Sequence, residues 1–100
     1  MNTVSKGRLL VIDDEERLRK LLARILQLEG YEVLEAATAK EGLRRLENEV
    51  VDVVISDVKL PDINGIELTK TIKVSHPAVE IIVLTAYGTI CKSSAKSGLN

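Results

Sequence analysis

Four short stretches rich in apolar residues divide the chain at regular intervals. They cover residues 9–12, 32–36, 51–56 and 81–84. Stretches of this length, bounded by charged or turn-forming residues, are typical of strands buried within a sheet. The pattern therefore predicts four β-strands.

Amphipathic stretches separate the predicted strands. Apolar side chains recur at helical spacing at Leu18, Leu21, Leu22, Ile25 and Leu26, which predicts a helix over residues 16–28. Thr38 and Glu41 have the spacing of a capping box, so a second helix is expected from there to about residue 49. A third helix is predicted over 66–74 and ends before Pro77, because proline disfavours helical geometry in the residue before it.

Strands that alternate with helices favour a parallel sheet with right-handed crossovers. The chain is therefore expected to form an α/β, doubly wound domain. After residue 89 the alternation stops, and from Cys91 on only three widely spaced apolar positions remain: Cys91, Ala95 and Leu99. We expect a domain over residues 1–89 and an irregular or weakly helical tail over residues 90–100.

Composition mainly excludes functions. The 100 residues are 45% hydrophobic and 29% charged, which is ordinary for one soluble domain. A net charge of -1 gives no electrostatic support for nucleic-acid binding. No apolar stretch approaches the roughly 20 residues that cross a bilayer, and the single cysteine fits a reducing compartment. We expect a cytoplasmic protein that binds neither nucleic acid nor membrane.

Polar side chains follow three of the predicted strands. Asp13 and Asp14 follow the first, Asp57 closes the third and Thr85 follows the fourth. The carboxyl ends of parallel strands meet at the edge of the sheet where ligands bind. Carboxylates gathered there repel one another unless a cation joins them, and Mg²⁺ is suited to such a site. Aspartate also accepts phosphoryl groups covalently, so a reactive Asp beside a divalent metal is indicated.

Each of these residues also has an ordinary structural explanation. Asp13 and Asp14 can cap the first helix, Asp57 can be a polar strand end, and Thr85 suits a strand. The sequence contains no glycine-rich phosphate loop, and its acidic turn would repel nucleotide phosphates. The conjunction at three strand ends favours metal-dependent chemistry.

Two segments resemble a known family. Residues 56–65, Ser-Asp-Val-Lys-Leu-Pro-Asp-Ile-Asn-Gly, contain a D-x-x-L-P-x-x-x-G motif, and residues 84–89 are Leu-Thr-Ala-Tyr-Gly-Thr. With Asp13 and Asp14, they resemble the receiver domain of two-component response regulators over about residues 7–89. The resemblance implies a flavodoxin-like (CheY-like) parallel sheet of order 2-1-3-4, with the family's fifth strand and last helix missing or replaced.

The resemblance also implies roles for individual residues. Asp57 would be the phosphoacceptor, taking a phosphoryl group from a sensor histidine kinase in a Mg²⁺-dependent reaction. Asp14 would bind the metal directly and Asp13 through water, while Asp57 and the backbone carbonyl of Lys59 complete the ligands.

Further residues would bind the phosphoryl oxygens. The resemblance assigns this role to the Thr85 hydroxyl and the Ala86 backbone amide, with Thr85 reporting the modified state. The family's fifth-strand lysine has no counterpart, since Lys92 and Lys96 are the only later lysines and lie where no strand is predicted. Such a domain is a phosphoacceptor rather than an enzyme, and it relays phosphorylation as a conformational change, for example in transcription regulation.

Alternatives to this interpretation stay open. Without the family's lysine, the fold can be a non-phosphorylated pseudo-receiver that acts as a protein-interaction or dimerisation module. A phosphohydrolase of the haloacid-dehalogenase type also uses a strand-end Asp and magnesium, but it would carry a second Asp where Lys59 stands.

Loss of the fifth strand has a further consequence for assembly. It would leave residues 81–84 as a free sheet edge and would uncover apolar surface on the first helix. We therefore expect a homodimer or a segment-exchanged oligomer.

Overall fold

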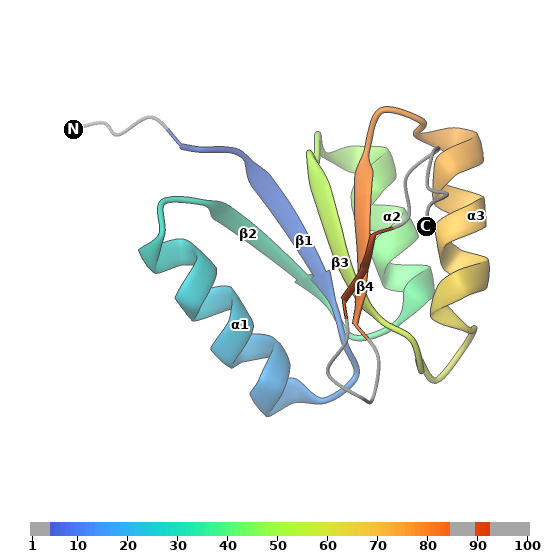
Figure 1. Cartoon of the computed structure of the whole chain (residues 1–100), viewed down its shortest axis with the longest axis horizontal. Helices are drawn as coiled ribbons and strands as arrows, with labels where there is room; N and C mark the ends of the chain where they lie inside the picture. The colour runs from blue at the N-terminus through green and yellow to red at the C-terminus, as the bar shows by residue number, and fades with distance from the viewer. Residues whose placement is uncertain (1–4, 85–89, 93–100) are drawn as a thin grey trace.

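The computed structural model describes residues 5–84 and 90–92. In this part of the chain, a five-stranded sheet of order β2-β1-β3-β4-β5 forms the centre of the molecule (Figure 1). The strands are β1 (Arg8–Ile12), β2 (Glu32–Ala36), β3 (Val53–Asp57), β4 (Glu80–Leu84) and β5 (Ile90–Lys92). Strands β1 to β4 are parallel, which confirms the flavodoxin-like fold of order 2-1-3-4.

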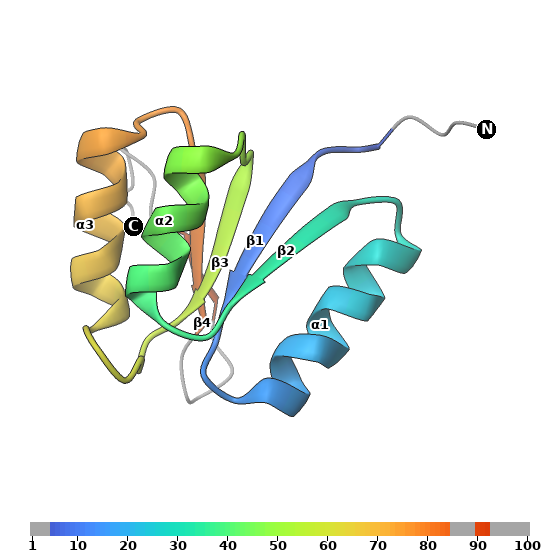
Figure 2. The same cartoon turned by 180° about the vertical axis from the view of Figure 1, so that it is seen from behind.

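Helices connect the parallel strands and lie on both faces of the sheet. Helix α1 (Glu16–Leu28) lies on one face, and α2 (Ala39–Asn48) and α3 (Gly65–Ser75) lie on the other (Figures 1 and 2). The predicted capping box is partly confirmed, because the Thr38 hydroxyl accepts a hydrogen bond from the Glu41 amide at 3.1 Å. Within the described residues, no helix is long and apolar enough to cross a membrane.

The main core lies between the sheet and helices α2 and α3. Fully buried residues on the strands pack against fully buried residues of α3. Those on the strands include Leu10, Ile12, Val54 and Ile81, and those on α3 are Leu68 and Ile72. Burial of each such side chain contributes roughly 1.5–3 kcal/mol. This packing fixes the register of β1 against β3, so that Ile12 pairs with Ser56. Asp13 and Asp57, the residues that follow this pair, therefore lie at the same level at one edge of the sheet.

The face that carries α1 is covered less completely. Ala23 is buried, but the apolar residues on the outer side of α1 are between 45% and 76% exposed: Leu18, Leu21, Ile25 and Leu28. On β3 and β4, alternate residues such as Ile55 and Ile82 are only half-buried. The apolar stripe predicted for α1 is therefore only partly used against the sheet.

Strand β5 corrects the prediction for the end of the chain. Residues 90–92 were expected to be irregular or weakly helical, but they pair antiparallel with β4, Leu84 opposite Ile90. The five intervening residues are too few for a parallel crossover, which needs a dozen or more, and they suit a hairpin. Strand β4 is therefore not the free edge that the sequence pattern predicts.

Candidate functional site

Strands β1 and β3 bring three carboxylates to one edge of the sheet, its lower end in Figure 1. Asp57 is the last residue of β3, and Asp13 and Asp14 follow β1 directly. Carboxylate oxygens of Asp13, Asp14 and Asp57 all lie within 4.8 Å of one another. The structure thus brings together the acidic residues that the sequence singled out.

Asp13 is the most buried of the three, with 3% of its surface exposed. Its backbone amide donates to the Ala36 carbonyl at 3.0 Å, and its side chain accepts from the Glu15 amide at 2.9 Å. Desolvation raises the pKa of Asp13, and repulsion from Asp57 and Asp14 adds to this rise against the lowering effect of the Glu15 amide. A carboxylate destabilised in this way is one that a divalent cation would stabilise.

The helix-capping explanation for Asp13 and Asp14 is not supported. The N-cap of α1 is Glu15, and its side chain makes no capping hydrogen bond. The hydrogen bond that Asp13 accepts comes from Glu15, outside the helix, and Asp14 is exposed. In the part of the chain that the structure describes, neither carboxylate therefore caps α1.

The loop after β3 folds back beside Asp57. Gly65 donates its amide to the Val58 carbonyl at 2.7 Å, and Lys59 forms an isolated antiparallel bridge with Asn64. A Cβ at Gly65 would collide with the Asp57 carbonyl oxygen. Glycine is therefore required here by close approach of two backbone segments rather than by a positive φ. The loop holds Lys59 two residues from Asp57, and the Lys59 amide lies 3.5 Å from the Asp57 carboxylate.

Two predicted phosphoryl-binding residues, Thr85 and Ala86, lie outside the described residues, as does Lys96. Leu84 pairs with Asp57, so β4 ends at the same level as β3. Lys92 lies in β5, where its backbone pairs with Ile82. That position is two residues, roughly 7 Å, short of the carboxyl edge of the sheet.

Sequence reasoning missed one residue of this region. The carboxylate of Asp62 accepts hydrogen bonds from the backbone amides of Ala39 at 3.0 Å and Lys40 at 2.8 Å. These amides lie 23 and 22 residues away in the chain. An Asp between Pro61 and a glycine turn resembles a local turn former, so no sequence signal indicated the contact with α2.

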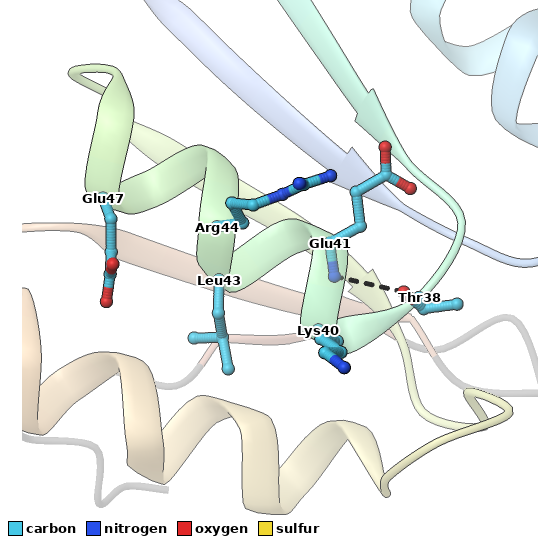
Figure 3. A pocket seen from close by; sticks show the side chains of 6 residues that line it. All are labelled: Thr38, Lys40, Glu41, Leu43, Arg44 and Glu47. Atoms are coloured by element: carbon cyan, nitrogen blue, oxygen red, sulfur yellow. Dashed lines mark hydrogen bonds between the residues drawn. The ribbon is translucent and has the colours of Figure 1, made fainter.

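A hollow on the outer side of α2 is not lined by Asp13, Asp14 or Asp57 (Figure 3). It is lined by Thr38, Lys40, Glu41, Leu43, Arg44 and Glu47. All of these residues come from one helix and its N-cap, and their charges are of both signs. The hollow therefore has no convergent chemistry that would make it an active site.

Comparison with known proteins identifies the family. The model of the response regulator receiver domain matches residues 9–99. The chain belongs to this family. The receiver domain is 44% identical over 84 residues to the transcriptional regulatory protein GlrR of Escherichia coli K12, covering 84% of this chain. It is 36% identical over 81 residues, or 81% of this chain, to sporulation initiation phosphotransferase F of Bacillus subtilis.

The chain spans only part of these relatives, 19% of GlrR and 65% of phosphotransferase F. Among solved structures, a CheY-like receiver domain from Methanospirillum hungatei is 40% identical, with a TM-score of 0.79 over 85% of this chain and 68% of that one. The response regulator TrrA of Thermotoga maritima, solved with Mg²⁺ and BeF, is 41% identical, with a TM-score of 0.77 over 81% and 70%.

The family match confirms the resemblance drawn from the acidic residues and the loop motif. Receiver domains of two-component systems are phosphoacceptors that interact with histidine kinases and bind Mg²⁺ at an acidic pocket. The match rules out the haloacid-dehalogenase interpretation. Nothing in the comparisons favours a pseudo-receiver. The family model extends beyond residue 89, and the domain boundary at that residue stays a prediction.

Proposed function

We propose that this receiver domain accepts a phosphoryl group on Asp57 from the phosphohistidine of a sensor histidine kinase. A carboxylate oxygen of Asp57 attacks phosphorus while the phosphorus–nitrogen bond of the donor breaks, which leaves an acyl phosphate and a free histidine. The observation that carries this proposal is the convergence of Asp57 with Asp13 and Asp14, whose oxygens lie within 4.8 Å of one another.

The residues present fit a magnesium ion. Three carboxylates share the site, and burial and repulsion already raise the pKa of Asp13, so a divalent cation would relieve their repulsion. Asp13, Asp14 and Asp57, with the Lys59 backbone carbonyl, would hold the ion. When bound, Mg²⁺ neutralises charge on the oxygens of the transferring phosphoryl group. Asp57 is half-buried and is the last residue of β3, so its carboxylate would lie at the sheet edge that a phosphoryl donor can approach.

Thr85 and Ala86 complete the proposal. The Thr85 hydroxyl and the Ala86 amide would donate hydrogen bonds to phosphoryl oxygens, an assignment supported by their place in the Leu-Thr-Ala motif. Because Thr85 directly follows β4, such a bond would pull on the β4 end and relay phosphorylation as a conformational change. The domain would act as a phosphoacceptor, with at most slow self-phosphorylation and autodephosphorylation.

The wider setting is part of the proposal. A sensor histidine kinase would be the donor, and the likeness to a protein named as a transcriptional regulator supports an output in transcription regulation. The single cysteine fits the reducing cytoplasm as the site of action.

We also propose that the chain associates with a second copy of itself. Since β5 covers the edge of β4, the surface for this is the α1 stripe, defined as Leu18, Leu21, Ile25 and Leu28. The stripe has the a and d spacing of a heptad, and parallel pairing would place Arg24 opposite Glu29 of the second copy. A related receiver domain, NtrC4, 35% identical with a TM-score of 0.76, was solved as a dimer.

The phosphoacceptor is tested by incubation with acetyl phosphate and Mg²⁺, followed by intact mass. Wild type should gain about 80 Da, the mass added by phosphorylation, and the Asp57→Asn variant should gain nothing. Asp52→Asn serves as the control, because Asp52 is an exposed aspartate at the opposite end of β3. An adduct that survives in Asp57→Asn would place the acceptor elsewhere. No adduct on wild type would favour the pseudo-receiver.

A further inference from the structure

Asp62 joins the loop after the phosphoacceptor to the start of α2. One carboxylate oxygen accepts from the Ala39 amide at 3.0 Å and the other from the Lys40 amide at 2.8 Å. The next two amides of the helix are satisfied by Thr38, whose hydroxyl binds the Glu41 amide and whose carbonyl binds the Gly42 amide. The Gly42 amide makes the first internal bond of the helix, and the three amides before it, which lack internal partners, are all paired with side-chain oxygens, two of them from a distant residue.

The chemistry of this contact favours its persistence. A carboxylate at a helix N-terminus interacts favourably with the helix dipole, and charge-assisted hydrogen bonds are stronger than neutral ones. Desolvation alone would raise the pKa of Asp62, but hydrogen bonds from backbone amides, those of Ala39 and Lys40 foremost, lower it overall. Asp62 is therefore ionised at neutral pH and tied to α2 by its charged form.

The opposite end of the same loop is also fixed. Gly65 donates to the Val58 carbonyl at 2.7 Å, and the Asn64 side chain accepts from the Ile66 amide at 2.6 Å as the N-cap of α3. The segment between these anchors contains Lys59, whose carbonyl is a ligand of the proposed metal site. Asp62, three residues beyond Lys59, holds this segment against α2 through its two hydrogen bonds.

We propose that Asp62 is a positioning residue for the metal site: by tying the loop to α2 it holds the Lys59 carbonyl where Mg²⁺ needs it. This inference rests on the proposed function, because it presumes that the ion is held by the carboxylates and this carbonyl. Groups that orient metal ligands typically affect metal affinity about 10- to 100-fold. We place Asp62 near the low end, about tenfold, because it acts on one ligand and through the backbone.

The test compares Mg²⁺ affinity in wild type, Asp62→Ala, Asp62→Asn and Asp52→Ala, measured by calorimetric titration. Asp52 is the matched control, since its exposed carboxylate also accepts a backbone amide, that of Arg8 at 2.8 Å, but at the amino end of the sheet. Asp62→Ala should weaken Mg²⁺ binding about tenfold. Asp62→Asn, which keeps one acceptor oxygen, should fall between it and wild type, and Asp52→Ala should bind as wild type.

A second readout separates positioning from loss of stability. In acetyl phosphate reactions, the Mg²⁺ concentration for half-maximal rate should rise in Asp62→Ala, while the rate at saturating Mg²⁺ stays close to wild type. Hydrogen exchange at the Ala39 and Lys40 amides should accelerate in the same variant and not in Asp52→Ala.

Three outcomes would overturn the inference: equal Mg²⁺ affinity in Asp62→Ala and wild type, an equal loss in Asp52→Ala, or no Mg²⁺ binding by wild type. A failure of the proposed function has a different signature. In that case wild type binds Mg²⁺ and Asp62→Ala weakens this binding, yet no phosphoryl adduct forms on Asp57.

Discussion

At the scale of single residues, Asp13 suits the proposed metal site but, when ionised, lowers the stability of the fold. Its carboxylate is buried beside two other carboxylates, and desolvation followed by their repulsion raises its pKa. A raised folded-state pKa means that folding favours the protonated acid. The ionised form present at pH 7 therefore destabilises the folded state.

Asp13→Asn should for this reason stabilise the protein at pH 7 in EDTA. The amide keeps an oxygen for the Glu15 hydrogen bond and removes the repulsion. Substitutions of this kind typically add about 0.5–2 kcal/mol, or a few degrees in melting temperature. Thermal melts with and without Mg²⁺ check this, and the ion should stabilise wild type more than Asp13→Asn, which keeps the Asp14 and Asp57 carboxylates. A variant that melts below wild type in EDTA would show that repulsion does not dominate. Asp14→Asn is the control and should gain less, because Asp14 is exposed.

At the scale of elements, α1 depends on a small number of polar contacts. Arg19 donates to the Glu35 carboxylate on β2 at 3.0 Å and to the Asp13 carbonyl at 2.9 Å. Since much of the apolar stripe of α1 stays exposed, we expect the Arg19–Glu35 pair to contribute to holding α1 against the sheet. Desolvation acts to raise the pKa of Glu35, but the hydrogen bond from Arg19 and the charge of Lys20 lower it overall.

Glu35→Gln should lower stability by roughly 1 kcal/mol at neutral pH. Because the folded-state pKa of Glu35 lies below 4.5, its contribution is present above pH 4.5 and disappears as pH falls through the lowered value. Melting temperatures of wild type and variant should therefore differ at pH 7 and 5 and converge at acidic pH. A constant difference across this range would assign the effect to packing. Glu67→Gln, in an exposed pair of 4.0 Å with Lys70, is the control and should have no effect.

At the scale of the whole molecule, apolar side chains are distributed unevenly over the two faces. The α2 and α3 side is a continuous core, whereas the α1 stripe is 45–76% exposed. Contiguous exposed apolar surface marks interfaces or aggregation-prone regions. Self-association through this stripe would bury it.

Leu21→Lys should weaken self-association at least about tenfold, or about 1.4 kcal/mol. The reason is that a cation in the centre of the stripe meets Arg17 and Arg24 on the same helix and apolar residues on the other copy. Light scattering over a concentration series should show wild type rising from 11.0 kDa toward twice that mass and the variant staying low. Val74→Lys replaces an apolar residue of α3 that is 83% exposed and should behave as wild type. A monomeric wild type at high concentration would contradict the proposal.

Much of the fold and the core of the site follow from sequence alone, because their signals are local. Helical spacing and a following glycine place α1 at Glu16–Leu28, as the structure has it, and the strand at Glu32–Ala36 is equally well predicted. Parallel topology then dictates that residues at the carboxyl ends of β1 and β3 meet. The convergence of Asp13 and Asp57 could for this reason be predicted from the sequence.

What only the tertiary structure decided involves partners distant in the chain. Ile90–Lys92 has no strand signal of its own, and it becomes β5 because β4 offers an unpaired edge. Asp62 is a turn residue in sequence and a tie to α2 in space, since its partners lie more than twenty residues away. Leu21 belongs to a core stripe by spacing, yet it is 56% exposed because the sheet contacts only one side of α1. Periodicity specifies which side chains share a helix face, but only the packed molecule determines what covers that face.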